Sequence, residues 1–292
     1  MPTFDMTPQE VNDWIRCCVD ANGNRTTLVP PQRGMLAYRA VKQVNRWAVP
    51  GHIVEAGVWR GGMSCLMARA QLRSDVQTNQ LRGRRHVWLF DTFEGMAAPT
   101  SHDDRKSRLM YFNHTDHFCP YVDNKWCKGP LHDVQRLMHN QSTYPPSKVH
   151  YVKGPVESTL RSSSSSSDSG SDADSSDEHA QQLPMRIAVL RLDTDFYAST
   201  AAELEVLWPR LSPGGWLYID DYFDFGGCRT AVLQWLKLST PPNSTTSWLQ
   251  HAKRAGAFDK RTRTFHVHKS RPYNASHPFQ PVVHMLEASL RQ

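Results

Sequence analysis

Two short apolar segments of the sequence each end in a pair of aspartates. The first, LRLDTDFYAST, carries Asp193 and Asp195, and the second, WLYIDDY, carries Asp220 and Asp221. Removing an unpaired carboxylate from water is costly, so buried strands that end in several acids indicate a site rather than plain core. The chemistry open to such a cluster is cation binding or proton transfer.

The spacing of the four acids suggests how they divide these tasks. Strands that are neighbours in a sheet lie about 4.8 Å apart, so the carboxylates that follow them should converge. Asp193, Asp220 and Asp221 would form an all-oxygen ligand set, which favours Mg²⁺ or Ca²⁺ over zinc. Asp195 would point to the same side if the chain stays extended, and would serve as a base. The alternative is that some of these aspartates, Asp195 and Asp221 first, only cap helices.

Two earlier motifs have the pattern of a nucleotide-type cofactor site. The segment VEAGVWRGG closes an apolar strand with glycines, which let the backbone approach a ligand, and with the acid Glu55. An acid there suits a cationic amino group better than a pyrophosphate, which favours S-adenosylmethionine over NAD. In LFDTFEGM, Asp91 ends the next strand, where an acid accepts hydrogen bonds from ribose hydroxyls. A structural glycine turn and a simple strand cap are the alternatives.

Composition and charge limit the other classes of function. The 292 residues carry a net charge of +6, although Ser162–Ala180 is acidic, and no run of about 18 apolar residues predicts a membrane span. Basic clusters at 81–86 and 251–271 lack an aromatic recognition motif, so nucleic-acid binding is not expected. The six cysteines show no disulfide framework, and His114, His117, Cys119 and Cys127 do not match zinc-ligand spacing. The absence of a signal-peptide pattern predicts a cytoplasmic protein.

The elements that must position these residues alternate along the chain. TPQE at Thr7–Glu10 predicts a helix that starts with a capping box, and a second helix is expected over 35–48. From residue 51, nearly continuous apolar strands alternate with helical patterns, which is typical of a doubly wound α/β domain with a mostly parallel sheet. The strands are expected at 52–58, 86–91, 149–154, 186–193 and 216–221, with an edge strand over 260–270.

The chain divides into an N-terminal helical cover, residues 1–50, and a main domain, residues 51–292. Two regions interrupt the main domain. Residues 97–148 form a long polar, His-rich stretch, and connections of that length are usually lids or binding loops. The Ser/Asp-rich stretch 162–180 is of low complexity and is expected to be disordered.

Five blocks of the sequence together resemble the macrocin O-methyltransferase (TylF) family. They are VEAGVWRGG, FDTFEGM, LRLDTDFYAST, LWPRLSPGGWLYIDDY and GCRTAV, in family order over roughly residues 26–237. The resemblance implies a class I, Rossmann-like methyltransferase fold and a metal-dependent enzyme that uses S-adenosylmethionine to methylate sugar hydroxyls. It implies Mg²⁺ on Asp193, Asp220 and Asp221 and a general base at Asp195. The cofactor positions that follow are Glu55, Ala56, Gly57, Val58, Gly61, Asp91, Thr92 and Gly154.

The sequence therefore predicts an O-methyltransferase that depends on S-adenosylmethionine and Mg²⁺. Its partner would be a sugar or another polyhydroxylated small molecule, and a homo-oligomer is left open. Two alternatives are a catalytically idle binding protein of the same fold and a metal-dependent phosphohydrolase built on the aspartate cluster.

Overall fold

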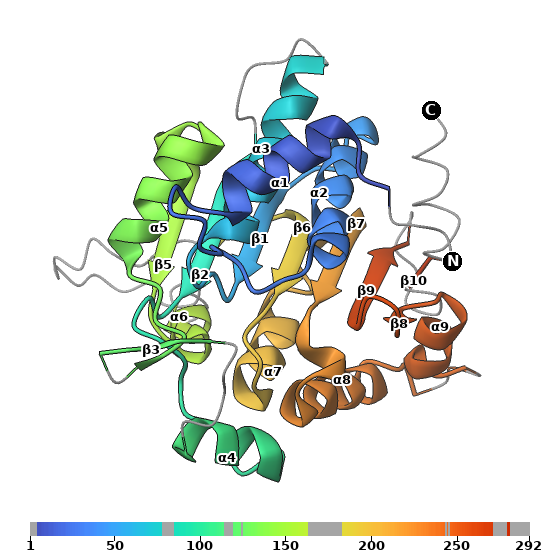
Figure 1. Ribbon diagram of the computed structural model, residues 1–292. Coiled ribbons are helices and arrows are strands. Elements are labelled where there is room, and N and C mark those ends of the chain that lie inside the picture. The colour runs from blue at the N-terminus through green and yellow to red at the C-terminus, as the bar shows by residue number, and fades with distance from the viewer. Residues whose placement is uncertain are drawn as a thin grey trace, which may run out of the picture.

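The computed structural model describes residues 5–77, 85–113, 119–123, 125–162, 183–242, 244, 246–270 and 279–280. These residues build one eight-stranded sheet in the order β10-β9-β7-β6-β1-β2-β5, with β8 paired to β9 outside this path (Figure 1). The strands are β1 (His52–Ala56), β2 (Val87–Asp91), β5 (Val149–Lys153), β6 (Ile187–Leu192), β7 (Leu211–Ile219), β8 (Phe258–Asp259), β9 (Thr264–Lys269) and β10 (Phe279–Gln280). The five strands β5, β2, β1, β6 and β7 pair with one another in parallel, and β9 is antiparallel to β7, β8 and β10. This arrangement confirms the predicted doubly wound, mostly parallel sheet.

The chain order reverses between β1 and β6, and this point of reversal determines where a ligand can bind. From β1 the chain runs outward through β2 to β5, and then returns to β6 and continues to β7 on the other side. In register, Ala56 lies opposite both Phe90 and Leu192, and Leu192 lies opposite Ile219. The residues that follow these strand ends therefore meet at one edge, the usual ligand site of such sheets.

Helices cover both faces of the sheet, and strand residues alternate between the two cores. On one face lie α1 (Pro8–Cys18), α2 (Pro31–Arg46) and α3 (Gly62–Gln77), and on the other α6 (Val156–Ser162), α7 (Tyr197–Val206), α8 (Gly226–Leu238) and α9 (Trp248–Arg254) (Figure 1). Ile53 and Leu89 point into the first core, and Val54 and Phe90 point into the second. This period of two is what a strand with both faces buried requires.

The N-terminal helix α1 begins with the predicted capping box, in which Thr7 and Glu10 exchange hydrogen bonds. Its attachment differs from a simple apolar contact. Asp13 is buried and accepts hydrogen bonds from Tyr38 on α2 and Arg69 on α3, at 2.9 and 2.7 Å, whereas the apolar Ile15 is 55% exposed. Ion pairs thus hold α1 against α3. Residues of α2 belong to the same hydrophobic core as residues of the sheet. The division into a cover and a main domain stays a prediction.

The prediction that the cysteines lack a disulfide framework is wrong. Cys17 on α1 is bonded to Cys65 on α3, and Cys119 is bonded to Cys127. The cysteines are scattered in the sequence, and only the packing of α1 on α3 and a short hairpin bring these pairs together. Of the four residues whose spacing does not match a zinc site, Cys119 and Cys127 are bonded to each other, and His114 and His117 lie outside the described residues.

The region 97–148 is more structured than a plain connection. It contains α4 (Arg105–Asn113), β3 (Tyr121–Val122), β4 (Lys125–Trp126), α5 (Leu131–Leu137), the π-helix η1 (Met138–Ser142) and the 3₁₀ helix η2 (Pro146–Lys148). Val134 and Met138 of its second half are fully buried in the core beneath α1 and α3. The lid role of its first half stays a prediction. Most of the Ser/Asp stretch, from residue 163, lies outside the described residues.

Two predicted strand features need correction. Strand β6 ends at Leu192, one residue before Asp193, because the chain turns there toward α7. The strand expected at an edge, β9, instead lies between β7 and β10, and all six of its residues are buried. Its alternation of polar and apolar residues suggested an exposed face, but His266, His268 and Lys269 are polar residues inside the fold.

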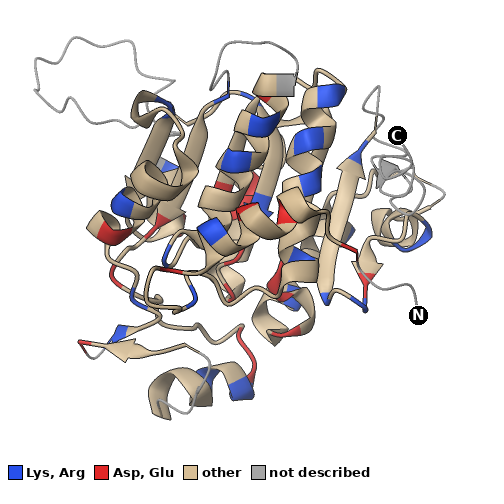
Figure 2. Ribbon diagram, turned by 45° about the horizontal axis from the view of Figure 1, so that its top comes forward, with Lys and Arg blue, Asp and Glu red and all other residues tan. Residues whose placement is uncertain are grey.

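Where the structure describes the two basic clusters, at 85–86 and 251–270, they do not form one surface stripe. Arg85 and Lys269, one from each cluster, are buried, and Figure 2 shows Lys and Arg distributed over several helices and loops. Within the described residues, no helix combines the length and the apolar character that crossing a bilayer requires.

Because two histidines are fully or partly buried, we expect the free energy of unfolding to fall in mild acid. Burial lowers the pKa of His266 to about 4, despite the opposing charge of Asp259, and burial also lowers the pKa of His52 to about 4. A histidine that is harder to protonate when folded stabilises the protein above pH 6.5, and this contribution is lost as the pH falls from about 6.5 toward 4. Urea unfolding should show a free energy about 1–2 kcal/mol smaller at pH 5 than at pH 7 from His266 alone.

The matched substitutions are His266→Gln and His132→Gln, since the His132 side chain is 74% exposed. The first should flatten the pH dependence and the second should leave it unchanged. Equal slopes for wild type and His266→Gln would show that His266 does not set this dependence.

Candidate active site

A cavity of about 630 Å³ opens at the carboxyl edge of the sheet, where the chain order reverses. Strand ends, the N-terminal segment and the region 97–148 all contribute to its wall. The predicted site residues that line it are Glu55, Gly57, Val58, Asp91, Thr92, Gly154, Asp193, Asp195, Asp220 and Asp221. Ala56 and Gly61, also predicted, are not among its lining residues. Its size is that of a small-molecule site.

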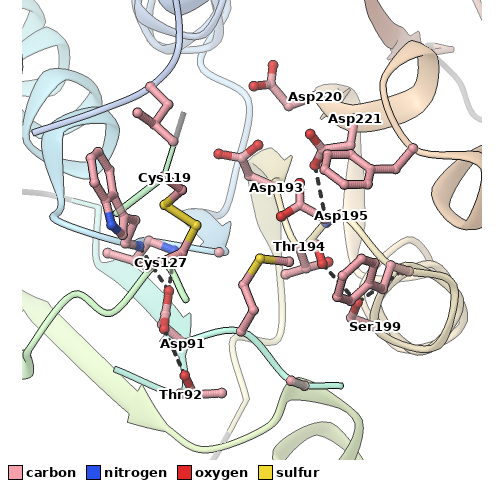
Figure 3. A pocket seen from close by; sticks show the side chains of 18 of the residues that line it. Asp91, Thr92, Cys119, Cys127, Asp193, Thr194, Asp195, Ser199, Asp220 and Asp221 are labelled. Carbon is pink, nitrogen blue, oxygen red and sulfur yellow. Dashed lines mark hydrogen bonds between the residues drawn. A yellow bond between two sulfur atoms is a disulfide. The ribbon is translucent and has the colours of Figure 1, made fainter. Parts of the chain in front are cut away.

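The four aspartates lie near one another in the wall of this cavity, as Figure 3 shows. Asp195 has a left-handed backbone, with φ of 65°, so the extended geometry expected for it is wrong, although its side chain still lies beside Asp221. Its backbone N–H donates to Asp221 Oδ2 at 3.2 Å. A non-glycine residue with this φ is strained, and such strain persists only where neighbouring contacts fix the chain.

Burial and neighbouring carboxylates raise the pKa values of the two acids that follow β7. Burial, with the nearby carboxylate of Asp193, raises the pKa of Asp220 to about 6. Burial also raises the pKa of Asp221 well above its ordinary value, and the carboxylates of Asp195, Asp193 and Asp220 add to the rise. Strongly perturbed carboxyls in a cavity are typical of functional sites.

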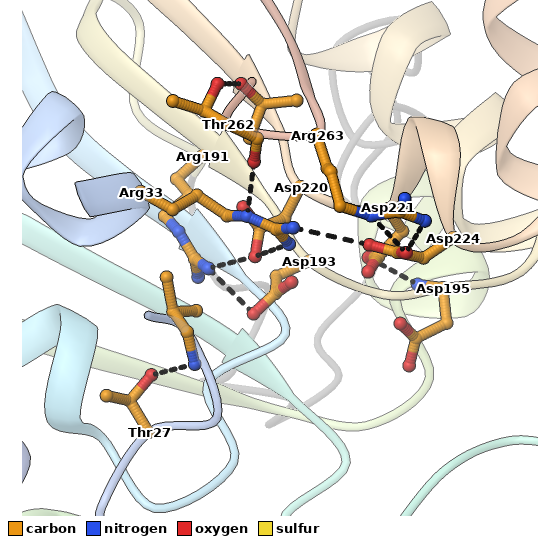
Figure 4. Close-up of polar contacts among 12 residues, drawn as sticks. Thr27, Arg33, Arg191, Asp193, Asp195, Asp220, Asp221, Asp224, Thr262 and Arg263 are labelled. Carbon is orange, nitrogen blue, oxygen red and sulfur yellow. Dashed lines mark hydrogen bonds and ion pairs between the residues drawn. The ribbon is translucent and has the colours of Figure 1, made fainter. Parts of the chain in front are cut away.

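Two arginines that the sequence reasoning missed partly neutralise this cluster (Figure 4). Arg191 of β6, whose side chain is only 3% exposed, donates from one nitrogen to Glu55 at 2.6 Å and from another to Asp193 at 2.9 Å and Asp220 at 3.1 Å. Arg33 of α2 approaches Asp220 at 3.3 Å. An arginine inside the otherwise apolar strand IAVLRL was the available signal, because a buried guanidinium requires carboxylate partners. Arg33 carried no such signal.

The carboxylates of the cluster are suitable ligands for a hard cation, but their side chains are not arranged around a common point. Among the residues that the structure describes, no three acidic, histidine or cysteine side chains converge to hold a metal ion as they stand. Asp193 and Asp220 instead turn an oxygen toward Arg191. All donors in the cluster are carboxylate oxygens, however, and that set suits Mg²⁺ or Ca²⁺.

The glycine-rich turn after β1 places backbone against the second half of the site. Gly57 has φ of 82°, and a Cβ there would overlap the backbone of Asp193, so only glycine lets the ends of β1 and β6 approach this closely. Glu55, predicted to face an amino group, is fully buried and is paired with Arg191 and the hydroxyl of Ser64. Its cofactor role stays a prediction that has to accommodate these two partners.

Asp91 also has partners that the sequence did not indicate. Its Oδ2 accepts the backbone N–H groups of Val58 and Trp59, at 2.7 and 2.9 Å, and its Oδ1 accepts that of Phe93 at 2.7 Å. Burial raises the pKa of Asp91, and these three N–H groups oppose the rise. The carboxylate therefore fixes the turn after β1, and the ribose contact stays a prediction.

The comparisons with known proteins agree with this architecture. The model of the macrocin O-methyltransferase (TylF) family matches residues 12–119 and 176–243. An 8-demethyl-8-(2,3-dimethoxy-alpha-L-rhamnosyl)-tetracenomycin-C 4'-O-methyltransferase of Streptomyces olivaceus is 36% identical over 63% of this chain and 57% of its own length. The chain thus spans little more than half of that relative.

A second relative and a solved structure are similar over more of their length. Mycinamicin III 3''-O-methyltransferase of Micromonospora griseorubida is 32% identical over 70% of this chain and 68% of its own. The solved O-methyltransferase NovP superposes with a TM-score of 0.60 and 25% identity, over 89% of this chain and 88% of that one.

Loss of the buried guanidinium should destabilise the whole protein. Arg191→Met would leave Glu55, Asp193 and Asp220 without their shared counter-charge, and breaking a buried ion pair in this way costs about 3–5 kcal/mol. Urea unfolding at pH 7 measures the loss. The control is Arg136→Met, which removes an ion pair whose arginine is 67% exposed and should cost under about 1 kcal/mol. Equal losses in both variants would contradict a special role for Arg191.

Proposed function

Since the chain belongs to the macrocin O-methyltransferase family, we propose that it is an O-methyltransferase that uses S-adenosylmethionine and a divalent cation. Its acceptor is a hydroxyl of a sugar or another polyhydroxylated small molecule. The observation that carries the proposal is that the four aspartates and the glycine-rich turn after β1 line one cavity. The names of the two relatives support the acceptor class, since both are O-methyltransferases and one name includes a rhamnosyl group.

The cofactor half of the cavity is assigned to the ends of β1, β2 and β5. S-adenosylmethionine supplies the methyl group on a positively charged sulfur. Gly57 and Val58 offer close backbone approach, Asp91 holds their turn rigid, and Thr92 and Gly154 line the adjacent wall. Glu55 contributes negative charge behind the turn, balanced on its far side by Arg191.

Asp193, Asp220 and Asp221 are the residues that would hold the cation. A divalent cation held there would lower the pKa of an acceptor hydroxyl. Arg191 contacts both Asp193 and Asp220, and Arg33 contacts Asp220, so these two side chains lie close together without that ion.

Asp195 is assigned the proton transfer. It lies beyond the end of β6 at the cavity wall, and its strained backbone turns it away from the line of the strand. A carboxylate within hydrogen-bonding reach of the acceptor oxygen would remove its proton as the methyl group is transferred. Apolar side chains that line the same cavity offer a surface for the less polar part of an acceptor; they are Met96, Met110, Trp126, Phe196 and Phe225.

Asp91→Ala should weaken S-adenosylmethionine binding by about 1–3 kcal/mol, because backbone N–H groups or ribose hydroxyls lose their acceptor. Isothermal titration calorimetry measures the affinity, and thermal unfolding without cofactor separates the two causes. A lower Tm in the absence of cofactor indicates that Asp91 acts through the turn, and an unchanged Tm indicates direct ribose contact. Unchanged affinity would exclude both roles.

The aspartate variants should fail in different ways. Asp220→Asn removes a ligand charge, so methyl transfer should fall and recover in part at high Mg²⁺, by mass action. Asp195→Asn leaves the proposed ligands intact and should stay inactive at any Mg²⁺ concentration, with cofactor affinity near wild type. The measurement is methyl transfer to a polyhydroxylated acceptor across a Mg²⁺ titration. Full wild-type activity in EDTA, or an active Asp195→Asn variant, would refute this division of roles.

A further inference from the structure

The helices α7 and α8 begin directly after the acidic cluster and lack caps of their own. Helix α7 starts at Tyr197, two residues after Asp195, and α8 starts at Gly226, five residues after Asp221. Their N-cap residues, Phe196 and Phe225, provide no side-chain hydrogen bond to the exposed N–H groups. A helix of this length normally needs an acceptor at its N-terminus, and a carboxylate there also interacts favourably with the helix dipole.

Two consecutive aspartates from a distant part of the chain supply these acceptors. Asp103 Oδ1 accepts the N–H of Tyr197 at 2.8 Å, and Asp104 Oδ2 accepts the N–H of Gly226 at 2.6 Å. Asp103 is 4% exposed, and its second oxygen accepts both the N–H and the hydroxyl of Thr100, at 2.7 and 3.0 Å. The pair therefore ties one turn of the region 97–148 to both helices.

The glycines at the start of α8 are shaped for this contact. A Cβ at Gly226 would overlap the carboxylate of Asp104, and a Cβ at Gly227 would overlap that of Asp103. Although burial acts to raise it, the pKa of Asp104 is lowered, because Ser107 and the N–H of Gly226 stabilise its charged form. Asp104 therefore stays ionised at neutral pH, as a helix cap requires.

Aromatic packing reinforces the same junction. Phe196 is buried against Trp126, with ring centroids 6.3 Å apart, and against Phe225 at 5.9 Å, while His102 stacks on Tyr197 at 4.4 Å. Phe196, directly after Asp195, is thus held by its ring, and Tyr197 is held by its backbone N–H. These are the contacts that a strained φ at Asp195 needs in order to persist.

We propose that Asp103 and Asp104 are positioning residues, which cap α7 and α8 from the region 97–148 and thereby fix Asp195 and the loop that follows Asp221. They do not touch the reacting atoms. Asp103 acts on Asp195 through Phe196 and Tyr197, and Asp104 acts on the loop 221–225 through Gly226. The catalytic part of this assignment rests on the proposed function, and the structural part stands without it.

Hydrogen–deuterium exchange on the full chain tests the structural part. In Asp103→Ala, amide exchange should become faster in residues 196–201, and in Asp104→Ala in residues 226–231, with the other helix and the rest of the domain unchanged. Each variant is thus the control of the other. Asp133→Ala, in α5, repeats the loss of charge at a partly exposed residue and should change neither segment. Uniform faster exchange throughout the domain, or none at the two helices, would overturn the proposal.

Kinetics tests the consequence for the reaction. Asp103→Ala should lower kcat by about 10- to 100-fold, the usual effect of a misplaced catalytic group, while the Kd for S-adenosylmethionine changes by less than about threefold. Asp103→Asn keeps an oxygen acceptor and should recover most of kcat, which also covers the case in which the alanine variant does not fold. A kcat within about twofold of wild type in Asp103→Ala would overturn the catalytic role. If wild type itself transfers no methyl group, the proposed function fails, and the exchange result still decides the positioning.

Discussion

The buried guanidinium of Arg191 is the interaction on which the site depends. It lies on a central strand and joins Glu55 of β1 to Asp193 and to Asp220 beyond β7. Without a counter-charge, these three carboxylates would repel one another, and the two that are buried, Glu55 and Asp220, would have a large desolvation cost. The arginine lets them gather at the point where the sheet order reverses, and thereby couples the proposed cofactor side of the cavity to the proposed cation side.

The acidic cluster is assembled from segments that are distant along the chain. Arg33 reaches it from the N-terminal helices, and Asp103 and Asp104 hold the two helices that follow it. Helix α1 is itself held to α3 by ion pairs from the buried Asp13 to Arg69 and Arg73. A change in either covering region can therefore alter the site without touching a residue that lines it.

Close approach of backbone explains several residues that have no chemistry of their own. Gly57 lets two strand ends meet, and Gly226 and Gly227 admit two carboxylates to a helix start. The strain at Asp195 has the same origin, since the chain must leave β6 and enter α7 within a few residues. Packing around Phe196 offsets that cost, so the strained residue is kept where a proposed base is needed.

The sequence by itself determined that the central strands form a parallel sheet, and it determined the family, because buried strands and helices leave local periodicities and the motifs are contiguous. It also placed Asp91, Asp193, Asp195, Asp220 and Asp221 at one edge, since residues after parallel strands must meet there.

Only the tertiary structure decided which partner each carboxylate has. Asp91 binds backbone N–H groups, Glu55 binds an arginine 136 residues away, and Asp103 caps a helix 94 residues away. The cysteine pairs and the interior position of β9 likewise could not be predicted from the sequence. Such pairings depend on distances between segments that only the packed fold brings together, and local sequence pattern contains no information on those distances.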